Sequence, residues 1–371
     1  MIAGEASGDT HAAGLMAALL DCDPGISFAG LGGPAMSGLA GGIRNWIGEA
    51  AVVGLWEVLK KYRYFRGQFD RTLDELEDFA PDILVLVDYP GFNLRLAAEV
   101  RKRGISTRII HYISPQVWAW KRGRIARMAR ILDRMLCLFP FEVPLYCNSG
   151  LDARFVGHPI AEQLAGLRGT CERDEQLVAL LPGSRRREVE KIFPVMLGAA
   201  TEMLKLKPGL RFASAAADGE LAGRMQTMAS AHGVDCPVGV GHAHELMATA
   251  CCAAVASGTA TLEAAFLGLP YCLVYRVSWP TYHVARALMA VDYLGMANLL
   301  AGRELVREFL QGDALAGRVS AELLRLSESE EAREKLGREL QAVTAPLAEL
   351  GAYQRAAVAT LEVGSSSGEL P

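Results

Sequence analysis

The chain has 371 residues, of which 51% are hydrophobic and 22% are charged. This length is enough for two domains, because single hydrophobic cores stop growing at about 250–300 residues. The formal net charge of -4 argues against a general nucleic-acid-binding protein, which would usually be basic, so we expect no nucleic-acid partner. The eight cysteines have no CxxC spacing, which argues against a disulfide framework or a zinc site.

The amino-terminal part of the chain contains two glycine-rich segments. Residues 4–11 predict a strand-to-helix turn that is flanked by Glu5 and Asp9. Residues 30–35 match the dinucleotide-binding pattern GxGxxA by letter, but Pro34 intrudes and no helix obviously begins there. A dinucleotide-dependent oxidoreductase would depend on this second segment alone.

Residues 55–69 predict a basic amphipathic helix with aromatic side chains on its apolar face. This pattern is typical of a segment that lies at a membrane surface, and a core-facing helix with a solvated basic side is the alternative. A second basic stripe, beginning at two tryptophans, could meet anionic lipid or a phosphorylated acceptor. The candidate acceptor-contacting or membrane-contacting residues are Trp56, Tyr62, Phe65, Trp118, Trp120, Lys121 and Arg122.

Short apolar runs at residues 83–87, 108–113, 177–181 and 253–256 each precede a polar loop. Such runs predict buried parallel strands, and their alternation with helical patterns predicts an α/β fold. We expect two Rossmann-like parallel-sheet domains that face a cleft. The expected ranges are 1–165 for the first domain, 166–363 for the second domain, and 364–371 for a disordered tail.

Asp88 follows the first of these runs directly. A carboxylate next to a buried strand is costly unless it is used or well hydrogen-bonded. A general base that deprotonates a sugar hydroxyl would suit this position. A capping or turn-forming aspartate is the alternative.

Two strand–turn–helix loops in the second half could bind phosphate. Residues 257–263 read SGTATLE, so Gly258 and Thr259 would present backbone N–H groups at a helix N-terminus, and Glu263 could accept from a pair of ribose hydroxyls. An ordinary helix cap, in effect a capping box with Glu263, is the alternative. Residues 183–187 read GSRRR, and Arg185 lies nearest the turn. Its guanidinium could neutralise a leaving diphosphate, whereas pairing of the arginines with Glu188 and Glu190 is the alternative.

We expect neither a metal site nor a membrane-spanning helix. His242, His244 and Glu245 lie close in sequence, but no further metal ligand is apparent from spacing. The DxD at residues 21–23 falls at the end of a helical run, which favours a C-terminal turn. The most apolar stretch, residues 246–275, carries a carboxylate in its middle, which is costly inside a membrane.

A set of segments, considered together, resembles the lipid-A-disaccharide synthase family, a member of the GT-B class of glycosyltransferases. They occur in order along almost the whole chain: GEASGD (4–9), GGPAM (32–36), DYPGFN (88–93), HYISPQVWAWKRGR (111–124), LFPFE (138–142), FVGHP (155–159), LPGSRRREV (181–189), SGTATLEA (257–264) and MANLLAGRELV (296–306). Two positions depart from the family pattern as we expect it. Gly91 replaces an acidic residue, and Ala297 stands where proline is expected.

The resemblance implies an inverting glycosyltransferase of lipid A (lipopolysaccharide) biosynthesis. It would transfer a diacylated glucosamine from UDP-2,3-diacylglucosamine to the 6-hydroxyl of 2,3-diacylglucosamine 1-phosphate. The products would be a β-1,6 disaccharide 1-phosphate and UDP, with no metal or other cofactor. By resemblance, Asp88 is the general base and Glu5 helps to shape the cleft. The implied UDP-sugar contacts are Ser184, Arg185, Gly258, Thr259, Glu263 and Asn298.

The implied partners are the two acylated substrates and the cytoplasmic membrane surface. The resemblance therefore implies a cytoplasmic protein that associates peripherally with the inner face of the inner membrane, and it is compatible with a homodimer. Another UDP-sugar enzyme of the GT-B class is the nearest rival, such as a lipid-linked N-acetylglucosaminyltransferase or a UDP-sugar epimerase. The segment HYISPQVWAWK argues against both rivals. An inactive, membrane-binding relative is a third reading.

Overall fold

The computed structural model describes residues 1–47, 62–117, 122–169, 172–277, 279, 282 and 291–365. The chain forms two compact units, one made of Met1–Pro159 with Glu349–Pro371 and the other of Ile160–Ala348. The boundary therefore falls before residue 160, whereas the sequence pattern placed it after residue 165, and the end of the chain returns to the first unit. A sequence pattern shows which face of a helix is apolar, but it does not show which of two sheets that face will cover.

The first unit is built on a parallel sheet in which the described strands have the order β3-β2-β1-β4-β5-β6-β7. The strands are β1 (Ile2–Ala3), β2 (Gly30–Gly32), β3 (Ile43–Asn45), β4 (Ile83–Val87), β5 (Arg108–Tyr112), β6 (Arg134–Cys137) and β7 (Asp152–Phe155). The helices are α1 (Ala6–Cys22), α2 (Pro34–Ser37), α5 (Tyr62–Phe79), α6 (Pro90–Arg103), α8 (Ile125–Ile131), α9 (Glu142–Cys147) and α19 (Ala352–Ser365), with a 3-10 turn η1 (Arg122–Arg124).

Strand β4 coincides with the apolar run at residues 83–87, and its last four side chains are buried. A strand in the middle of a parallel sheet is covered on both faces, which is why its sequence is continuously apolar. Strand β5 ends at Tyr112, one residue before the end of the predicted run, because Ile113 has a φ of 68°. A β-branched residue rarely adopts this left-handed conformation. The backbone therefore leaves the sheet at Ile113.

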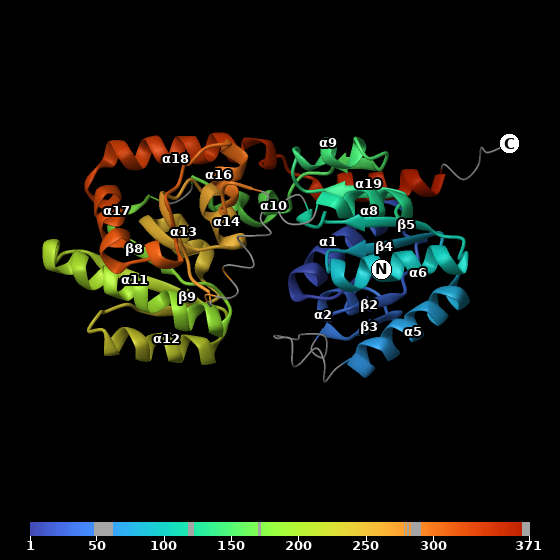
Figure 1. The fold of residues 1–371 in the computed structure, drawn as a ribbon, viewed down its shortest axis with the longest axis horizontal. Helices are drawn as coiled ribbons and strands as arrows, with labels where there is room; N and C mark the ends of the chain where they lie inside the picture. Colours follow the sequence, from blue (N-terminus) through green and yellow to red (C-terminus); the bar gives the residue numbers. More distant parts are fainter. Residues whose placement is uncertain are drawn as a thin grey trace. The chain divides into compact units, whose positions relative to one another are not determined.

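The helix α19, drawn in red in Figure 1, belongs to the first unit and packs against α1. The buried guanidinium of Arg134 on β6 donates to the Ala359 carbonyl and pairs with Asp152 at 2.6 Å and Glu362 at 3.2 Å. Arg355 of α19 donates from Nε to the Val156 carbonyl at 2.9 Å. Hydrogen bonds and ion pairs therefore join α19 to two neighbouring parts of the first unit.

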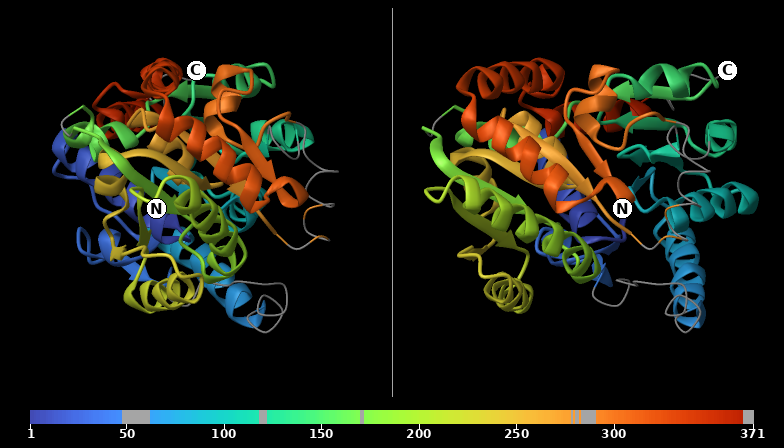
Figure 2. Two further views of the ribbon diagram at one scale, coloured as in Figure 1. Left: turned by 90° about the vertical axis from the view of Figure 1, so that its left-hand side faces the viewer. Right: turned by 60° about the vertical axis from the view of Figure 1, so that its left-hand side comes forward.

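The second unit contains another parallel sheet, with its described strands in the order β10-β9-β8-β11-β12-β13. Helices α11 (Arg186–Leu206) and α17 (Ala316–Glu328) pack on each other and against the central strands of this sheet, as Figure 2 shows in yellow-green and orange. The strands are β8 (Asp174–Leu181), β9 (Arg211–Ala216), β10 (Val238–Val240), β11 (Ala250–Ala256), β12 (Tyr271–Tyr275) and β13 (Glu308–Leu310). The helices are α10 (Ile160–Leu164), α11 (Arg186–Leu206), α12 (Gly219–Ala231), α13 (Ala243–Thr249), α14 (Thr259–Phe266), α16 (Met296–Ala301), α17 (Ala316–Glu328) and α18 (Glu330–Thr344), with the 3-10 turns η2 (Ala165–Leu167), η3 (Gln311–Asp313) and η4 (Ala345–Leu347).

Candidate active site

Two acidic residues meet at the carboxyl edge of the first sheet. Strands β1 and β4 are parallel neighbours, and Ala3 is in register with Val87. Glu5 and Asp88 follow these two strand ends, so the sheet itself brings the two carboxylates together. The carboxyl ends of parallel strands are where open α/β sheets bind ligands. The structure thus places both predicted acidic residues at the edge of the sheet that is suited to chemistry.

Asp88 is held in an unusual backbone conformation. Both Asp88 and Tyr89 have positive φ values, 45° and 46°. The fully buried Asn93, in the first turns of α6, donates from Nδ2 to the Val87 carbonyl at 3.2 Å and to the Asp88 carbonyl at 2.7 Å. The Asp88 amide donates to the Tyr112 carbonyl at 2.9 Å. Strained backbone persists only where the surroundings over-determine it, and such strain clusters at functional sites.

The Tyr89 ring fills the space over the β1–α1 turn. A Cβ added to Gly4 would lie 2.3 Å from Cδ1 of that ring, so only glycine permits this approach. Trp46 packs edge-on against Tyr89, with ring centroids 6.1 Å apart, and donates from Nε1 to the Ala3 carbonyl at 2.7 Å. The turns that carry Glu5 and Asp88 are therefore packed together through Tyr89 and Trp46.

Burial, followed by the nearby Glu5 carboxylate, raises the pKa of Asp88 from 3.8 to about 6, although the Tyr89 amide partly opposes this rise. A carboxyl group that titrates near neutral pH is suited to accept a proton in catalysis. The capping alternative does not apply to α6, because the N-cap of that helix is Tyr89. Glu5 is the N-cap of α1, but its side chain makes no capping hydrogen bond and is exposed.

The GxGxxA segment has a structural explanation. A short helix, α2, does begin at Pro34, contrary to the sequence interpretation. The buried carboxylate of Asp9 accepts hydrogen bonds from the amides of Gly33, Ala35 and Met36 at 2.7, 2.9 and 3.1 Å. A side-chain anion thus occupies the place where a dinucleotide phosphate would bind. Asp9 was predicted to flank the first turn, but its sequence position gave no sign of this role.

The two predicted phosphate loops lie side by side in the second unit. Strands β8 and β11 are parallel neighbours, with Leu181 in register with Val255, and the loops follow these strand ends. Gly183 and Gly258 have φ values of 106° and 148°, which side-chain-bearing residues rarely adopt. A Cβ added to Gly258 would meet no atom of the described residues within 4 Å, so the space over the start of α14 is open.

The arginine run makes the ion pairs that the structural alternative predicted. Arg185 is the N-cap residue of α11 and pairs with Glu188 at 3.3 Å, whereas Arg186 pairs with Glu190 at 2.7 Å. Exposed pairs of this kind contribute little to stability. Ser184 and Arg185 are both exposed at the turn. The Arg185 side chain can therefore exchange its partner for a diphosphate at small cost.

Glu263 is not part of a capping box. Helix α14 begins at Thr259, and the Thr261 hydroxyl donates to the Gly258 carbonyl at 2.7 Å. Glu263 lies a turn further along and forms an ion pair with His244 of α13, with 3.4 Å between Oε2 and Nε2. The His–His–Glu run considered as a possible metal ligand set is separated in this way, since His242 pairs instead with Glu245 at 3.9 Å.

Asn298 is buried and fully hydrogen-bonded. Its Oδ1 accepts from the amides of Leu305 and Val306, each at 2.8 Å, and its Nδ2 donates to the Val306 carbonyl and to Glu308, also at 2.8 Å. Glu308 in turn accepts from the amides of Leu294 and Gly295, both at 2.9 Å. A direct contact between Asn298 and a ligand would break one of these bonds.

Most of the predicted acceptor-contacting or membrane-contacting side chains lie outside the residues that the structure describes. Trp56, Trp118, Trp120 and Lys121 lie outside the described residues, as do the side chains of Tyr62 and Arg122. Phe65 is described, and its ring packs against the core of the first unit, with its centroid 6.2 Å from that of Trp46. The core-facing alternative therefore accounts for Phe65.

Two further expectations concern the described ranges. Within them, no helix is both long and apolar enough to cross a membrane. No group of three His, Cys, Asp or Glu side chains there is placed to hold a metal ion. The DxD forms a helix end, as expected, because α1 stops at Cys22 and Asp23 accepts from the Gly25 amide at 2.8 Å.

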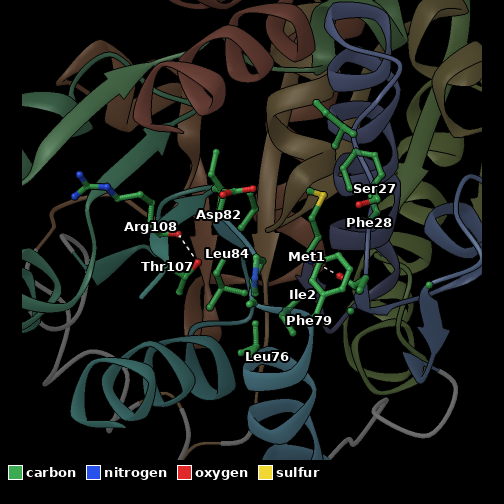
Figure 3. Close-up of a pocket in the computed structure, with 18 of the residues that line it drawn as sticks. Met1, Ile2, Ser27, Phe28, Leu76, Phe79, Asp82, Leu84, Thr107 and Arg108 are labelled. Carbon is green, nitrogen blue, oxygen red and sulfur yellow. Dashed lines mark hydrogen bonds between the residues drawn. The ribbon is translucent and has the colours of Figure 1, made fainter. Parts of the chain in front are cut away.

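A pocket in the first unit opens at the opposite, amino-terminal edge of the sheet. Met1, Ile2, Leu84 and Arg108 are among the residues that line it, as Figure 3 shows. The Met1 amine donates to the Ala29 carbonyl at 2.7 Å, and burial lowers its pKa to about 5. The carboxylates of Glu5 and Asp88 follow the other ends of these strands, so this pocket is separate from the candidate site.

Solved structures with the same fold include nucleotide-sugar enzymes. A UDP-GlcNAc 2-epimerase from Neisseria meningitidis bound to UDP-GlcNAc matches with a TM-score of 0.60 and 13% identity, covering 95% of this chain and 97% of that one. The calicheamicin glycosyltransferase CalG4 matches with a TM-score of 0.55 and 14% identity, covering 97% and 96%. The expected fold class, two Rossmann-like parallel-sheet domains of the GT-B class, is confirmed.

Comparison of the sequence with known proteins identifies the family, which the shared fold does not. The family model described as lipid-A-disaccharide synthetase matches residues 1–363. The lipid-A-disaccharide synthase of Geobacter sulfurreducens is 39% identical over 380 residues, covering 98% of this chain and 96% of the relative. That of Myxococcus xanthus is 37% identical over 371 residues, with the same coverage. The chain therefore belongs to the lipid-A-disaccharide synthase family, the glycosyltransferases that make the lipid A disaccharide.

Proposed function

We propose that the chain condenses UDP-2,3-diacylglucosamine with 2,3-diacylglucosamine 1-phosphate. The products are the β-1,6-linked disaccharide 1-phosphate and UDP, and the anomeric configuration is inverted. Family membership supports lipid A disaccharide synthesis. The environment of Asp88 supports the proposed transfer to a sugar hydroxyl. A carboxyl group with a pKa of about 6 is suited to take the proton from that hydroxyl.

In the proposed reaction, the Asp88 carboxylate accepts the proton of the acceptor 6-hydroxyl. The acceptor oxygen forms a bond to the anomeric carbon of the donor, while the bond from that carbon to the diphosphate oxygen breaks. UDP leaves with the bonding electron pair. A single displacement of this kind inverts the anomeric centre. Glu5 acts on the base through its charge, because it helps to raise the pKa of Asp88.

The second unit would bind the UDP portion. The open space over Gly258 and the N-terminal end of α14, which has no side-chain cap, suit a diphosphate. Arg185 would leave Glu188 to neutralise the departing charge, with Ser184 and Thr259 as neighbouring hydroxyl donors. Glu263 would accept hydrogen bonds from the ribose. We propose that Asn298 acts indirectly, by holding residues 294–306 through Glu308.

The acylated substrates require access to a membrane surface, and we propose peripheral attachment at the inner face of the inner membrane. The exposed Arg124, Arg127 and Arg130 of the second basic stripe support this location. Arginine side chains of this kind attract anionic headgroups.

The decisive experiment measures disaccharide formation and UDP release by the purified chain in detergent, with both acylated substrates. We expect turnover that survives EDTA, and we expect Asp88→Asn to reduce it about 100-fold or more. Asp70→Asn, at an exposed site on α5, is the matched control and should leave turnover unchanged. Near-normal turnover by Asp88→Asn would refute the role of the base. UDP release without a disaccharide, or epimerisation of the donor, would refute the transfer itself.

A further inference from the structure

The ion pair between His244 and Glu263 connects α13 to the start of α14. Glu263 is largely buried, with 16% of its side chain exposed, and His244 is 37% exposed. Of the two Glu263 oxygens, Oε2 is the one that lies 3.4 Å from Nε2 of His244. Glu263 lies one turn beyond Thr259, on the helix whose N-terminus opens into free space.

We propose that His244 is a positioning residue for Glu263, which holds one carboxylate oxygen so that the other is oriented toward the ribose hydroxyls of UDP. The inference rests on the proposed role of the second unit in binding UDP. An unrestrained glutamate loses side-chain entropy when a ligand fixes it, and a preorganised one loses less. The pair therefore strengthens nucleoside binding although His244 does not itself contact the nucleotide.

The charges around His244 favour its protonated form. The Glu263 carboxylate on α14 raises the pKa of His244 above 6.5, Glu245 on its own helix adds to the rise, and partial burial opposes it. The neighbouring His242 faces Glu245 at 3.9 Å. Because the pKa is raised, the cation that holds Glu263 is fully present below about pH 6.5 and is lost as the pH rises through the raised value.

Calorimetric titration of the full chain with UDP tests the inference without acylated substrates. We expect His244→Ala to raise the Kd for UDP about two- to fivefold at about pH 6, the range for a partly exposed ion pair. The effect should shrink as the pH is raised through the elevated pKa of the wild-type histidine. His242→Ala is the matched control because its side chain is 72% exposed and does not pair with Glu263. It should leave the Kd unchanged.

Two measurements separate positioning from a general structural effect. His244→Arg keeps a permanent cation, so it should restore UDP affinity and remove the part of the pH dependence that the wild-type chain shows beyond His244→Ala. The ratio of the Kd for 2′-deoxy-UDP to that for UDP should fall in His244→Ala, because the hydrogen bond from the ribose 2′-hydroxyl to Glu263 is weaker in this variant. A merely destabilised helix would weaken both nucleotides equally.

The outcomes distinguish a failure of this inference from a failure of the proposed function. An unchanged Kd for UDP in His244→Ala at about pH 6, or an unchanged 2′-deoxy-UDP ratio, would overturn the inference and leave the proposed function standing. A wild-type chain that binds UDP with the predicted pH dependence but makes no disaccharide would overturn the proposed function alone. A wild-type chain that binds no UDP would overturn both.

Discussion

Replacing Asp88 with asparagine should stabilise the first unit at neutral pH while it removes the proposed base. The rise in the Asp88 pKa from 3.8 to about 6 means that folding disfavours the ionised carboxylate. The sign follows from linkage: the cost is absent below about pH 4, grows as the pH rises through the interval up to about 6, and is complete above it. Asparagine, which carries no charge, avoids this cost.

The full shift corresponds to about 3 kcal/mol at 1.36 kcal/mol per pH unit. Asp88 is partly exposed, so solvent screening reduces the expected gain to about 1–2 kcal/mol. Asparagine also tolerates the positive φ of 45° at this position, and any benefit from that tolerance does not depend on pH. Comparing the gain in unfolding free energy at two pH values therefore isolates its electrostatic part.

Urea unfolding followed by tryptophan fluorescence provides the assay. The signal reports mainly on the first unit, because tryptophans 46, 56, 118 and 120 lie between Met1 and Pro159. We expect the gain in unfolding free energy at about pH 8 and little of it at about pH 4. The exposed control Asp70→Asn should stay within about 0.5 kcal/mol at both. An equal change at both pH values, or a loss at about pH 8, would show that Asp88 is not electrostatically strained.

Three other substitutions test the supporting contacts. Asn93→Ala removes both hydrogen bonds to the strained turn, so we expect a loss of about 1–3 kcal/mol in unfolding and a lower kcat at nearly unchanged KM. Arg134→Met removes the hydrogen bond and the ion pair that hold α19. We expect a loss of about 2–4 kcal/mol in unfolding free energy and faster proteolysis of the segment that begins at Glu349. Glu308→Gln keeps one oxygen acceptor but turns an N–H toward the amide of residue 294 or 295, so we expect the second unit to lose about 1–3 kcal/mol of unfolding free energy in thermal melts.

Exposed residues of the same types serve as controls for these three substitutions. Asn148→Ala, Arg127→Met and Glu304→Gln each alter a side chain at the surface and should change the unfolding free energy by no more than about 0.5 kcal/mol. A normal kcat in Asn93→Ala would contradict the role of that residue in positioning Asp88. Unaltered proteolysis in Arg134→Met, or unaltered melting in Glu308→Gln, would contradict the corresponding tethers.

The sequence by itself determined the strands and the loops that follow them. Buried parallel strands are covered on both faces, so residues 83–87 and 177–181 appear as apolar runs that end where β4 and β8 end. The polar residue after each run then lies at the edge of the sheet that binds ligands. Asp88 and Arg185 could be placed in this way because an apolar run and the polar loop after it are neighbours in the sequence.

Only the tertiary structure decided which groups those loops meet. Asp9 caps a helix that begins 25 residues later, His244 pairs with a glutamate on another helix, and Asn298 is saturated by its own loop. None of these pairings has a periodic signature, because each depends on how separate elements pack. The same reason applies to α19, whose place on the first unit is stabilised by contacts with Arg134 and from Arg355.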